Sequence, residues 1–225
     1  MIYGVGDTLD EATQVHDKNL TALLERCKEK SIWLNKEKVV LRVQQLDFMG
    51  HQLTAQGLKP DPNKVEAILK LETPKTKEDI ERLNGTVNYL AKFLPKLSQV
   101  MEPLRRLTQK GVEWCWGDSE DKAFAEVKQL VTQAPILAYY SPNKELLIQC
   151  DASNLGLGAA LMQEGRPLAH ASRALTDPET CYATIEKEML AIVFALEKWH
   201  QFIFGCHVVI RTDHKLTRSH YKETS

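Results

Sequence analysis

Several features that would indicate a membrane or secreted protein are missing from this sequence. No apolar run approaches the length of a membrane span, and the first residues do not form a basic segment followed by an apolar signal core. The five cysteines are widely spread and form no Cys-x-x-Cys pair, which argues against a disulfide framework or a zinc site. We therefore expect an intracellular protein, in the cytoplasm or nucleus, with no membrane partner.

Internal repeats and low-complexity segments are also missing, and the net charge is only −1. That small total conceals an uneven distribution. Residues 18–110 contain 18 Lys and Arg against 11 Asp and Glu, whereas residues 111–190 contain 6 against 12. A basic region can bind phosphates, and an acidic region beside it can bind a metal ion. This combination would suit a nucleic-acid-processing enzyme. Solvated helix faces are often uneven as well, so charge alone does not decide.

One stretch, residues 146–162, combines two apolar runs with a glycine-rich turn between them, which predicts two strands. Asp151 stands where the first run ends. Strand centres disfavour Asp, so an acid there needs a partner such as a hydrogen-bond donor, a cation or a metal. Taken singly, the residue could equally be a capping or surface acid.

Two further acids have similar settings, Glu188 in a predicted helix 182–202 and Asp213 at the end of a predicted strand. On a helical wheel Glu188 falls on the side expected to face the sheet, whereas Glu186 falls on the polar side. Converging carboxylates suit Mg²⁺ or Mn²⁺, which prefer oxygen ligands. Two such ions could activate a water and stabilise the leaving oxygen in phosphodiester cleavage.

The preceding half of the chain is predicted to be mostly helical. A long helix begins near Thr8, where Glu11 completes a capping box, and short strands are expected at residues 32–35 and 39–43. Residues 46–58 predict a hairpin with glycine at both bends. The helices expected after it begin near Pro62, Thr76, Leu97 and Ser119. Two prolines and a change in composition place a domain boundary near 141–144.

Several motifs now occur together in a specific order. They are Asp151-Ala152-Ser153 with Gly156-x-Gly158-Ala159, then Ser172-Arg173-x-Leu175, Tyr182-x-x-Ile185-Glu186-Lys187-Glu188-x-Leu190-Ala191, and Thr212-Asp213-His214-Lys215. This series closely resembles the ribonuclease H domain of gypsy-type LTR-retrotransposon Pol polyproteins.

The upstream motifs carry the same resemblance independently, and together the motifs cover residues 1–218. Phe48-Met49-Gly50-His51 is similar to the primer grip of reverse transcriptase, and residues 57–65 resemble the segment leading into the thumb. Residues 83–95 look like the thumb helix that follows the minor groove of the template-primer. Residues 114–117 and 134–137 resemble the connection region.

The resemblance implies an α/β (α+β) fold in four parts. These are a palm remnant with the primer-grip hairpin (1–58), a thumb-like helical region (59–110), a connection (111–143) and a truncated ribonuclease H-like mixed sheet with helix (144–225). The family activities are RNA-directed DNA synthesis and hydrolysis of RNA in RNA–DNA hybrids. The implied partners are an RNA–DNA hybrid or template-primer duplex and other Pol segments.

The resemblance also assigns roles to single residues. Asp151, Glu188 and Asp213 would be the catalytic ligands of Mg²⁺ or Mn²⁺. The residues expected to contact nucleic acid are Phe48, Met49, Gly50, Gly85, Thr86 and Tyr89. For these last six a packing role is the main alternative, since a hairpin Met and a helix Tyr are often core residues and a glycine can permit close packing.

Two departures from the family pattern affect what is expected of the chain. The polymerase Asp pair would precede Met1, and the pattern after Lys215 lacks the usual continuation and the fourth acid. Whether the chain is itself an enzyme is therefore open. The alternatives are a catalytically dead remnant or nucleic-acid-binding module, and, less consistent with the thumb-like half, an unrelated metal-dependent phosphotransferase.

Overall fold

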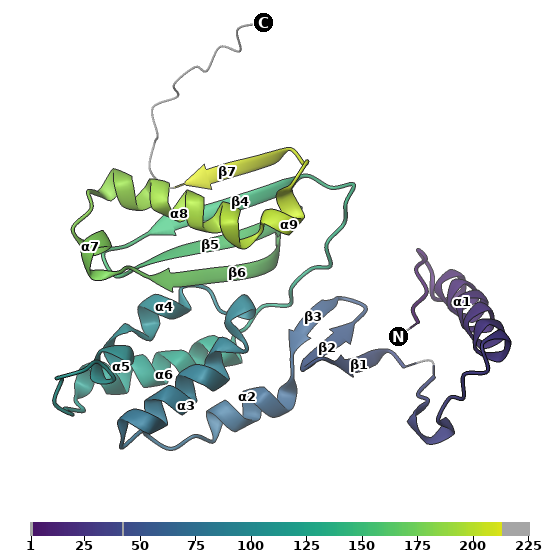
Figure 1. The fold of residues 1–225 in the computed structure, drawn as a ribbon, viewed down its shortest axis with the longest axis horizontal. Coiled ribbons are helices and arrows are strands. Elements are labelled where there is room, and N and C mark those ends of the chain that lie inside the picture. Colours follow the sequence, from purple (N-terminus) through teal and green to yellow (C-terminus); the bar gives the residue numbers. More distant parts are fainter. Residues whose placement is uncertain (1, 42, 213–225) are drawn as a thin grey trace, which may run out of the picture. The chain divides into compact units, whose positions relative to one another are not determined.

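The computed structural model describes residues 2–41 and 43–212, and the chain divides into two compact units, Met1–Val43 and Gln44–Ser225. Figure 1 labels the helices and strands of both units. Asp213, which was expected to be a metal ligand, lies outside the described residues. In the part of the chain that is described, no helix has the length and apolar character that crossing a membrane requires. The four-part division expected from the sequence stays a prediction.

The first unit contains one long helix, α1 (Leu9–Glu29), followed by a short 3-10 helix, η1 (Lys36–Lys38). The predicted capping box is confirmed: the Glu11 amide donates to the Thr8 hydroxyl oxygen over 3.2 Å, and the Thr8 amide donates to the Glu11 carboxylate. These bonds satisfy amide groups that the first helical turn leaves without partners.

The prediction of strands at 32–35 and 39–43 is wrong, because the described residues in these ranges form no strand. The Asn35 side chain instead accepts a hydrogen bond from the Glu37 amide at 2.9 Å and starts the 3-10 turn. Trp33 is 95% exposed and Val40 is 64% exposed, so neither packs on a sheet. β-Branched and aromatic residues favour strands only where a neighbouring strand and a packed face exist.

The second unit begins with a three-stranded antiparallel sheet, β1 (Gln45–Phe48), β2 (His51–Thr54) and β3 (Gly57–Pro60). The predicted glycine bends are confirmed at Gly50 and Gly57, which have φ of +71° and +140°. The Tyr139 hydroxyl donates to the Thr54 carbonyl oxygen at 2.9 Å and accepts from the Thr54 amide. This contact fixes the small sheet to the segment that precedes β4.

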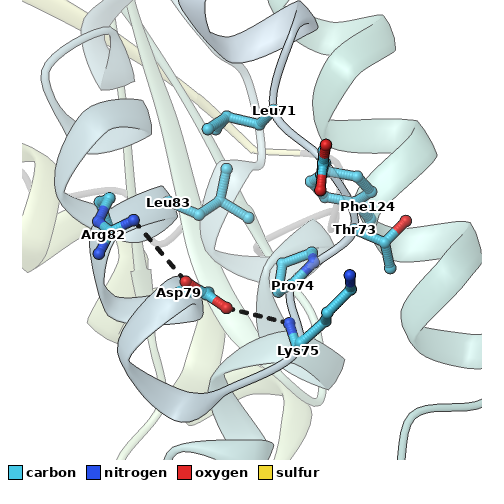
Figure 2. Close-up of a pocket in the computed structure, with 9 residues that line it drawn as sticks. Leu71, Thr73, Pro74, Lys75, Asp79, Arg82, Leu83 and Phe124 are labelled. Carbon is cyan, nitrogen blue, oxygen red and sulfur yellow. Dashed lines mark hydrogen bonds and ion pairs between the residues drawn. The ribbon is translucent and has the colours of Figure 1, made fainter.

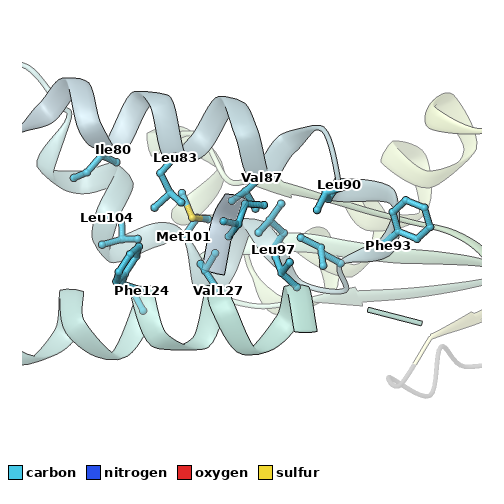
Figure 3. Packing of buried hydrophobic residues seen from close by; sticks show 14 of the residues in the cluster. Ile80, Leu83, Val87, Leu90, Phe93, Leu97, Met101, Leu104, Phe124 and Val127 are labelled. Atoms are coloured by element: carbon cyan, nitrogen blue, oxygen red, sulfur yellow. The ribbon is translucent and has the colours of Figure 1, made fainter. Parts of the chain in front are cut away.

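A group of short helices follows the small sheet. They are α2 (Pro62–Leu69), α3 (Lys77–Asn88), η2 (Ala91–Phe93), α4 (Leu97–Val100), α5 (Glu102–Leu107) and α6 (Asp118–Thr132). The single helix expected from Leu97 is divided at Met101, because Pro103 can occupy only the first turn of a new helix. The apolar faces share one core, in which Leu83, Val87 and Phe93 are fully or almost fully buried (Figure 3).

The C-terminal half is a four-stranded mixed sheet in the order β6-β5-β4-β7. Its strands are β4 (Leu146–Ala152), β5 (Gly156–Gln163), β6 (Arg166–Ala174) and β7 (Val208–Thr212), and its helices are α7 (Asp177–Thr180), α8 (Thr184–Lys198) and α9 (His200–Ile203). Adjacent strands are antiparallel except β4 and β7, which are parallel. The two strands predicted within residues 146–162 and the strand predicted before Asp213 are confirmed.

Helix α8 lies along one face of this sheet, against β4 and β5, and forms a second core with it (Figure 1). Parallel strands need a crossover connection, and the segment containing α8 supplies it between β4 and β7. η2 and α4 contact β6, and the Ser98 amide at α4 donates to the Ser172 hydroxyl oxygen at 3.0 Å. The helical region and the larger sheet are therefore in direct contact.

The connector between α6 and β4 is held by a buried glutamine. Gln163 on β5 is 3% exposed. Its side-chain oxygen accepts from the Ser141 amide at 3.0 Å, and its side-chain nitrogen donates to the carbonyl oxygens of Ser141 and Lys144 at 2.8 and 2.9 Å. A buried amide whose hydrogen bonds are made in this way fixes the path of the connector.

A paired arginine and glutamate join β6 to α7. Arg173 donates to both carboxylate oxygens of Glu179, at 2.7 and 3.1 Å, and this pairing is the main reason that the pKa of Glu179 falls from 4.5 to about 2. A carboxyl group with a lowered pKa stabilises the fold fully above its unfolded pKa, and this contribution is lost as the pH falls through the folded value.

We predict that Glu179→Gln lowers the free energy of unfolding by about 1 kcal/mol at neutral pH, a value kept small because both side chains retain some solvent contact. Urea denaturation of the variant and the parent should show this difference shrinking between pH 4.5 and about 2. An unchanged difference across that range would contradict a charge-assisted bond.

Candidate functional site

Asp151 lies near the end of β4, on the sheet face opposite α8. Ile148 and Cys150 are buried in the core beneath α8, and because side chains alternate along a strand, Gln149 and Asp151 point to the other face. The Asp151 side chain is 33% exposed, and its Oδ2 lies 2.6 Å from the Lys96 ammonium. The acid in the apolar run therefore has the cationic partner that its position required.

Lys96 approaches Asp151 from the start of α4. Its backbone is left-handed, with φ of +53°, which turns the chain from the preceding 3-10 helix into α4. A Cβ added at Gly158, the partner of Asp151 on β5, would lie 3.9 Å from the Lys96 Cγ, so the lysine stem passes over a position of β5 that has no side chain. A residue 55 positions away in the chain thus reaches the acid.

Glu188 lies on α8 and is 3% exposed, whereas Glu186 is exposed and accepts a hydrogen bond from the Ala183 amide at 2.7 Å. The predicted orientation of the two acids is confirmed. Burial, and after it the negative charge of Glu188, raises the pKa of the Cys150 thiol to about 11. Glu188 therefore lies close to β4 on the side of Cys150, the face opposite the one to which Asp151 points.

The side-chain chemistry of Asp151 and Glu188 indicates whether they could bind a hard cation. Within residues 2–41 and 43–212, no three His, Cys, Asp or Glu side chains gather as a metal site would require. Asp151 and Glu188 nevertheless supply carboxylate oxygens, the donor type that Mg²⁺ and Mn²⁺ prefer. Asp151 points to the sheet face opposite α8, and Glu188 is on α8, so the described residues show the donor type and not a formed site. The donor chemistry fits, and the ligand role itself stays a prediction.

A pocket of about 280 Å³ opens on the Asp151 face of the sheet. Strand pairing aligns Gln149 with Ala160 on β5 and Arg211 on β7, and Ala160 with His170 on β6. Burial lowers the pKa of His170, which keeps this ring neutral at physiological pH. The alternation of side chains along the strands could have predicted from the sequence that these residues lie beside Asp151. It could not have predicted the contact with Lys96.

A second pocket, of about 230 Å³, lies in the helical region between the loop after α2 and α6 (Figure 2). Its lining includes four charged residues, Glu72, Lys75, Asp79 and Arg82. Asp79 accepts hydrogen bonds from the amides of Lys75 and Thr76 at 3.1 and 3.2 Å, and the Thr76 bond is part of the capping box that begins α3. The Asp79 carboxylate is therefore used to begin a helix.

Phe48, Met49 and Gly50 form the turn between β1 and β2. Met49 and Gly50 both have positive φ, 48° and 71°, as a two-residue hairpin turn of this hand requires. Phe48 and Met49 are 43% and 76% exposed, so the turn presents two apolar side chains to solvent. Met49 therefore packs little against the described part of the chain, whereas Phe48 is more than half covered.

The other three residues expected to contact nucleic acid lie on or just after α3. Tyr89 reaches the Met49–Gly50 turn, and its hydroxyl donates to the Met49 carbonyl oxygen at 2.6 Å. The Thr86 hydroxyl donates to the Arg82 carbonyl oxygen at 2.9 Å. A Cβ at Gly85 would meet no described atom within 4 Å, so packing among the described residues does not require glycine there.

Two comparisons with known proteins relate this chain to reverse transcriptases and retrotransposon polyproteins. Residues 116–210 match the model of the RNase H-like domain found in reverse transcriptase. Over 207 residues, 89% of this chain, it is 30% identical to the Tf2-3 and Tf2-4 transposon polyproteins of Schizosaccharomyces pombe. The chain is therefore similar to one segment of these retrotransposon polyproteins. The resemblance to retrotransposon Pol polyproteins is therefore confirmed.

The chain spans only 16% of the length of these polyproteins. Solved structures of the foamy viral protease-reverse transcriptase share its fold. The complex with RNA/DNA hybrid has a TM-score of 0.76 and 20% identity over 92% of this chain and 28% of that one. The complex with dsDNA has a TM-score of 0.77 and 21% identity over 89% and 43%. The expected α/β (α+β) fold is confirmed.

We predict a weak coupling between Lys96 and Asp151. Their side chains are 58% and 33% exposed, and solvent-exposed ion pairs contribute roughly 0–1 kcal/mol. A double-mutant cycle with Lys96→Met and Asp151→Asn, measured by chemical denaturation, should give a coupling energy within that range. A coupling of several kcal/mol would mean that the pair is desolvated and structural.

Proposed function

We propose that this retrotransposon polyprotein segment binds an RNA–DNA hybrid or template-primer duplex and takes part in hydrolysis of the RNA strand. The observation that carries the proposal is the placement of two acids on either side of β4, Asp151 at the strand end on the face that α8 does not cover and Glu188 on the sheet-facing side of α8. Similar folds occur in proteins solved with RNA/DNA hybrid and with dsDNA, which supports this class of partner.

Asp151, Glu188 and Asp213 would hold Mg²⁺ or Mn²⁺, and bound metal would supply an activated water and stabilise the leaving oxygen of the phosphodiester. Because Lys96 pairs with Asp151, the ammonium must leave Oδ2 before that oxygen can bind a metal. The low exposure of Glu188 keeps bulk water from its carboxylate and strengthens its attraction for a cation.

The nucleic-acid surface would include the β1–β2 turn and α3. Phe48 and Met49 are exposed at the turn, and Gly85, Thr86 and Tyr89 follow along α3 and its C-terminal end. Lys64 lies over the Tyr89 ring, with its ammonium 5.5 Å from the ring centroid, and adds positive charge beside the turn. Apolar and aromatic side chains next to cations suit a duplex backbone and its bases.

Other segments of the polyprotein would act together with this one. The chain spans 16% of the length of these relatives. We propose that it contributes the primer-grip turn and the helices after it to DNA synthesis, together with other segments of the polyprotein.

A second candidate function is duplex binding without hydrolysis. The ion pair between Lys96 and Asp151 favours it, because the ammonium neutralises the carboxylate on which metal binding would depend. In this case the basic region 18–110 would hold the phosphate backbone, and affinity would fall steeply with added salt.

Cleavage of a labelled RNA–DNA hybrid by the purified chain in Mn²⁺ tests the two candidates. We expect the parent chain to cleave the RNA strand, Asp151→Asn and Glu188→Gln to lose that cleavage, and all three to retain hybrid binding in an anisotropy assay. Glu197→Gln, an exposed acid on the same helix, is the matched control and should cleave like the parent.

Salt-sensitive binding without cleavage by a folded preparation would favour the binding module. Cleavage that survives Asp151→Asn would assign the activity to other groups or to a contaminant. Failure of the folded chain to bind either a hybrid or a DNA duplex would reject both candidate functions.

A further inference from the structure

The turn between β1 and β2 has a backbone that needs external support. Met49 has φ of +48°, a left-handed conformation that is unfavourable for a residue with a side chain. Its own side chain is 76% exposed and so cannot anchor the turn by packing. A short hairpin on a small sheet is only marginally stable without contacts from elsewhere in the protein.

Tyr89 supplies such a contact from a position 40 residues away in the chain. Its hydroxyl donates to the Met49 carbonyl oxygen at 2.6 Å, which is a short bond for this pair of groups. The carbonyl belongs to the residue with the unfavourable φ. The bond therefore stabilises the turn at the point where its backbone is least favourable.

The Tyr89 ring is itself held in place by neighbouring rings. It stacks on His51 of β2, with centroids 5.6 Å apart and an interplanar angle of 28°. His51 in turn meets the edge of Phe93, at 5.5 Å, and Phe93 is fully buried in the helical core. This series connects the turn to the core through aromatic contacts, whose geometry restricts the ring positions.

Gly50 and Tyr89 fit each other closely. A Cβ built at Gly50 would lie 1.7 Å from the Tyr89 hydroxyl oxygen, a distance that no pair of unbonded atoms can adopt. Glycine is thus needed at position 50 for two reasons, the positive φ of the turn and the space that the tyrosine hydroxyl occupies. The residue beside the exposed Met49 is matched to the tyrosine.

We propose that Tyr89 is a positioning residue, whose hydroxyl holds the Met49–Gly50 turn against the end of α3 so that Phe48 and Met49 face a bound nucleic-acid duplex. This inference rests on the proposed duplex binding and specifies how it is achieved. It differs from a direct contact between the tyrosine ring and the duplex, because the hydroxyl group is the part that acts and it acts through the turn.

The substitution Tyr89→Phe separates the two roles, since it keeps the ring and removes only the hydroxyl. Loss of a hydrogen bond of this kind should weaken hybrid binding by about three- to tenfold in an anisotropy titration. The matched control is Tyr182→Phe, which removes the hydroxyl of a tyrosine of similar exposure, 44% against 45%, and should leave the affinity unchanged.

A double-mutant cycle tests whether the effect passes through the turn. Met49→Ala should weaken binding in the parent chain but have a smaller effect in Tyr89→Phe, because a loosened turn no longer presents the methionine. Independent, additive losses would overturn the proposal. So would parent-like affinity in Tyr89→Phe combined with weak binding in Tyr89→Ala, which would assign the role to the ring.

Amide hydrogen exchange in residues 48–51 tests the contact without nucleic acid. Exchange there should accelerate in Tyr89→Phe while the amides of the β4–β5 pair exchange as in the parent. If the parent chain binds no duplex but this local acceleration is seen, the proposed function fails and the hold on the turn stands. Unchanged exchange in residues 48–51 would reject the positioning role.

Discussion

The alternation of side chains along β4 is the constraint on which the rest of the C-terminal half depends. Residues 146, 148 and 150 enter the core under α8, so residues 149 and 151 must occupy the opposite face. The same strand pairs with β5 on one side and, in parallel, with β7 on the other. An acid can occupy this strand because its carboxylate reaches the face that α8 does not cover.

Much of this arrangement could be predicted from sequence because the signals are local. Apolar runs and glycine-rich turns predicted strands of the larger sheet, and the capping box at Thr8 predicted the start of α1. The wheel of α8 separated Glu188 from Glu186 because a helix that covers a sheet has a definite inner side. Each of these features depends on residues close together in the chain.

The features that sequence reasoning missed depend on residues far apart. Lys96 meets Asp151 only because α4 packs on the larger sheet, and nothing in the pattern around residue 96 indicates that contact. Tyr89 was expected to face a duplex, and its hydrogen bond to Met49 follows from the three-dimensional path between α3 and the small sheet. The expected strands at 32–35 and 39–43 failed for the opposite reason, since local propensity was present without a packed surface.

Gln163 stiffens the junction between the helices and the larger sheet. A segment with prolines at 135 and 142 would ordinarily serve as a free hinge. Three hydrogen bonds from one buried amide instead fasten the connector to β5, and Tyr139 fastens it to the small sheet. Bending at this junction would break these internal hydrogen bonds, so the connector acts as a fastening between the helices and the sheet.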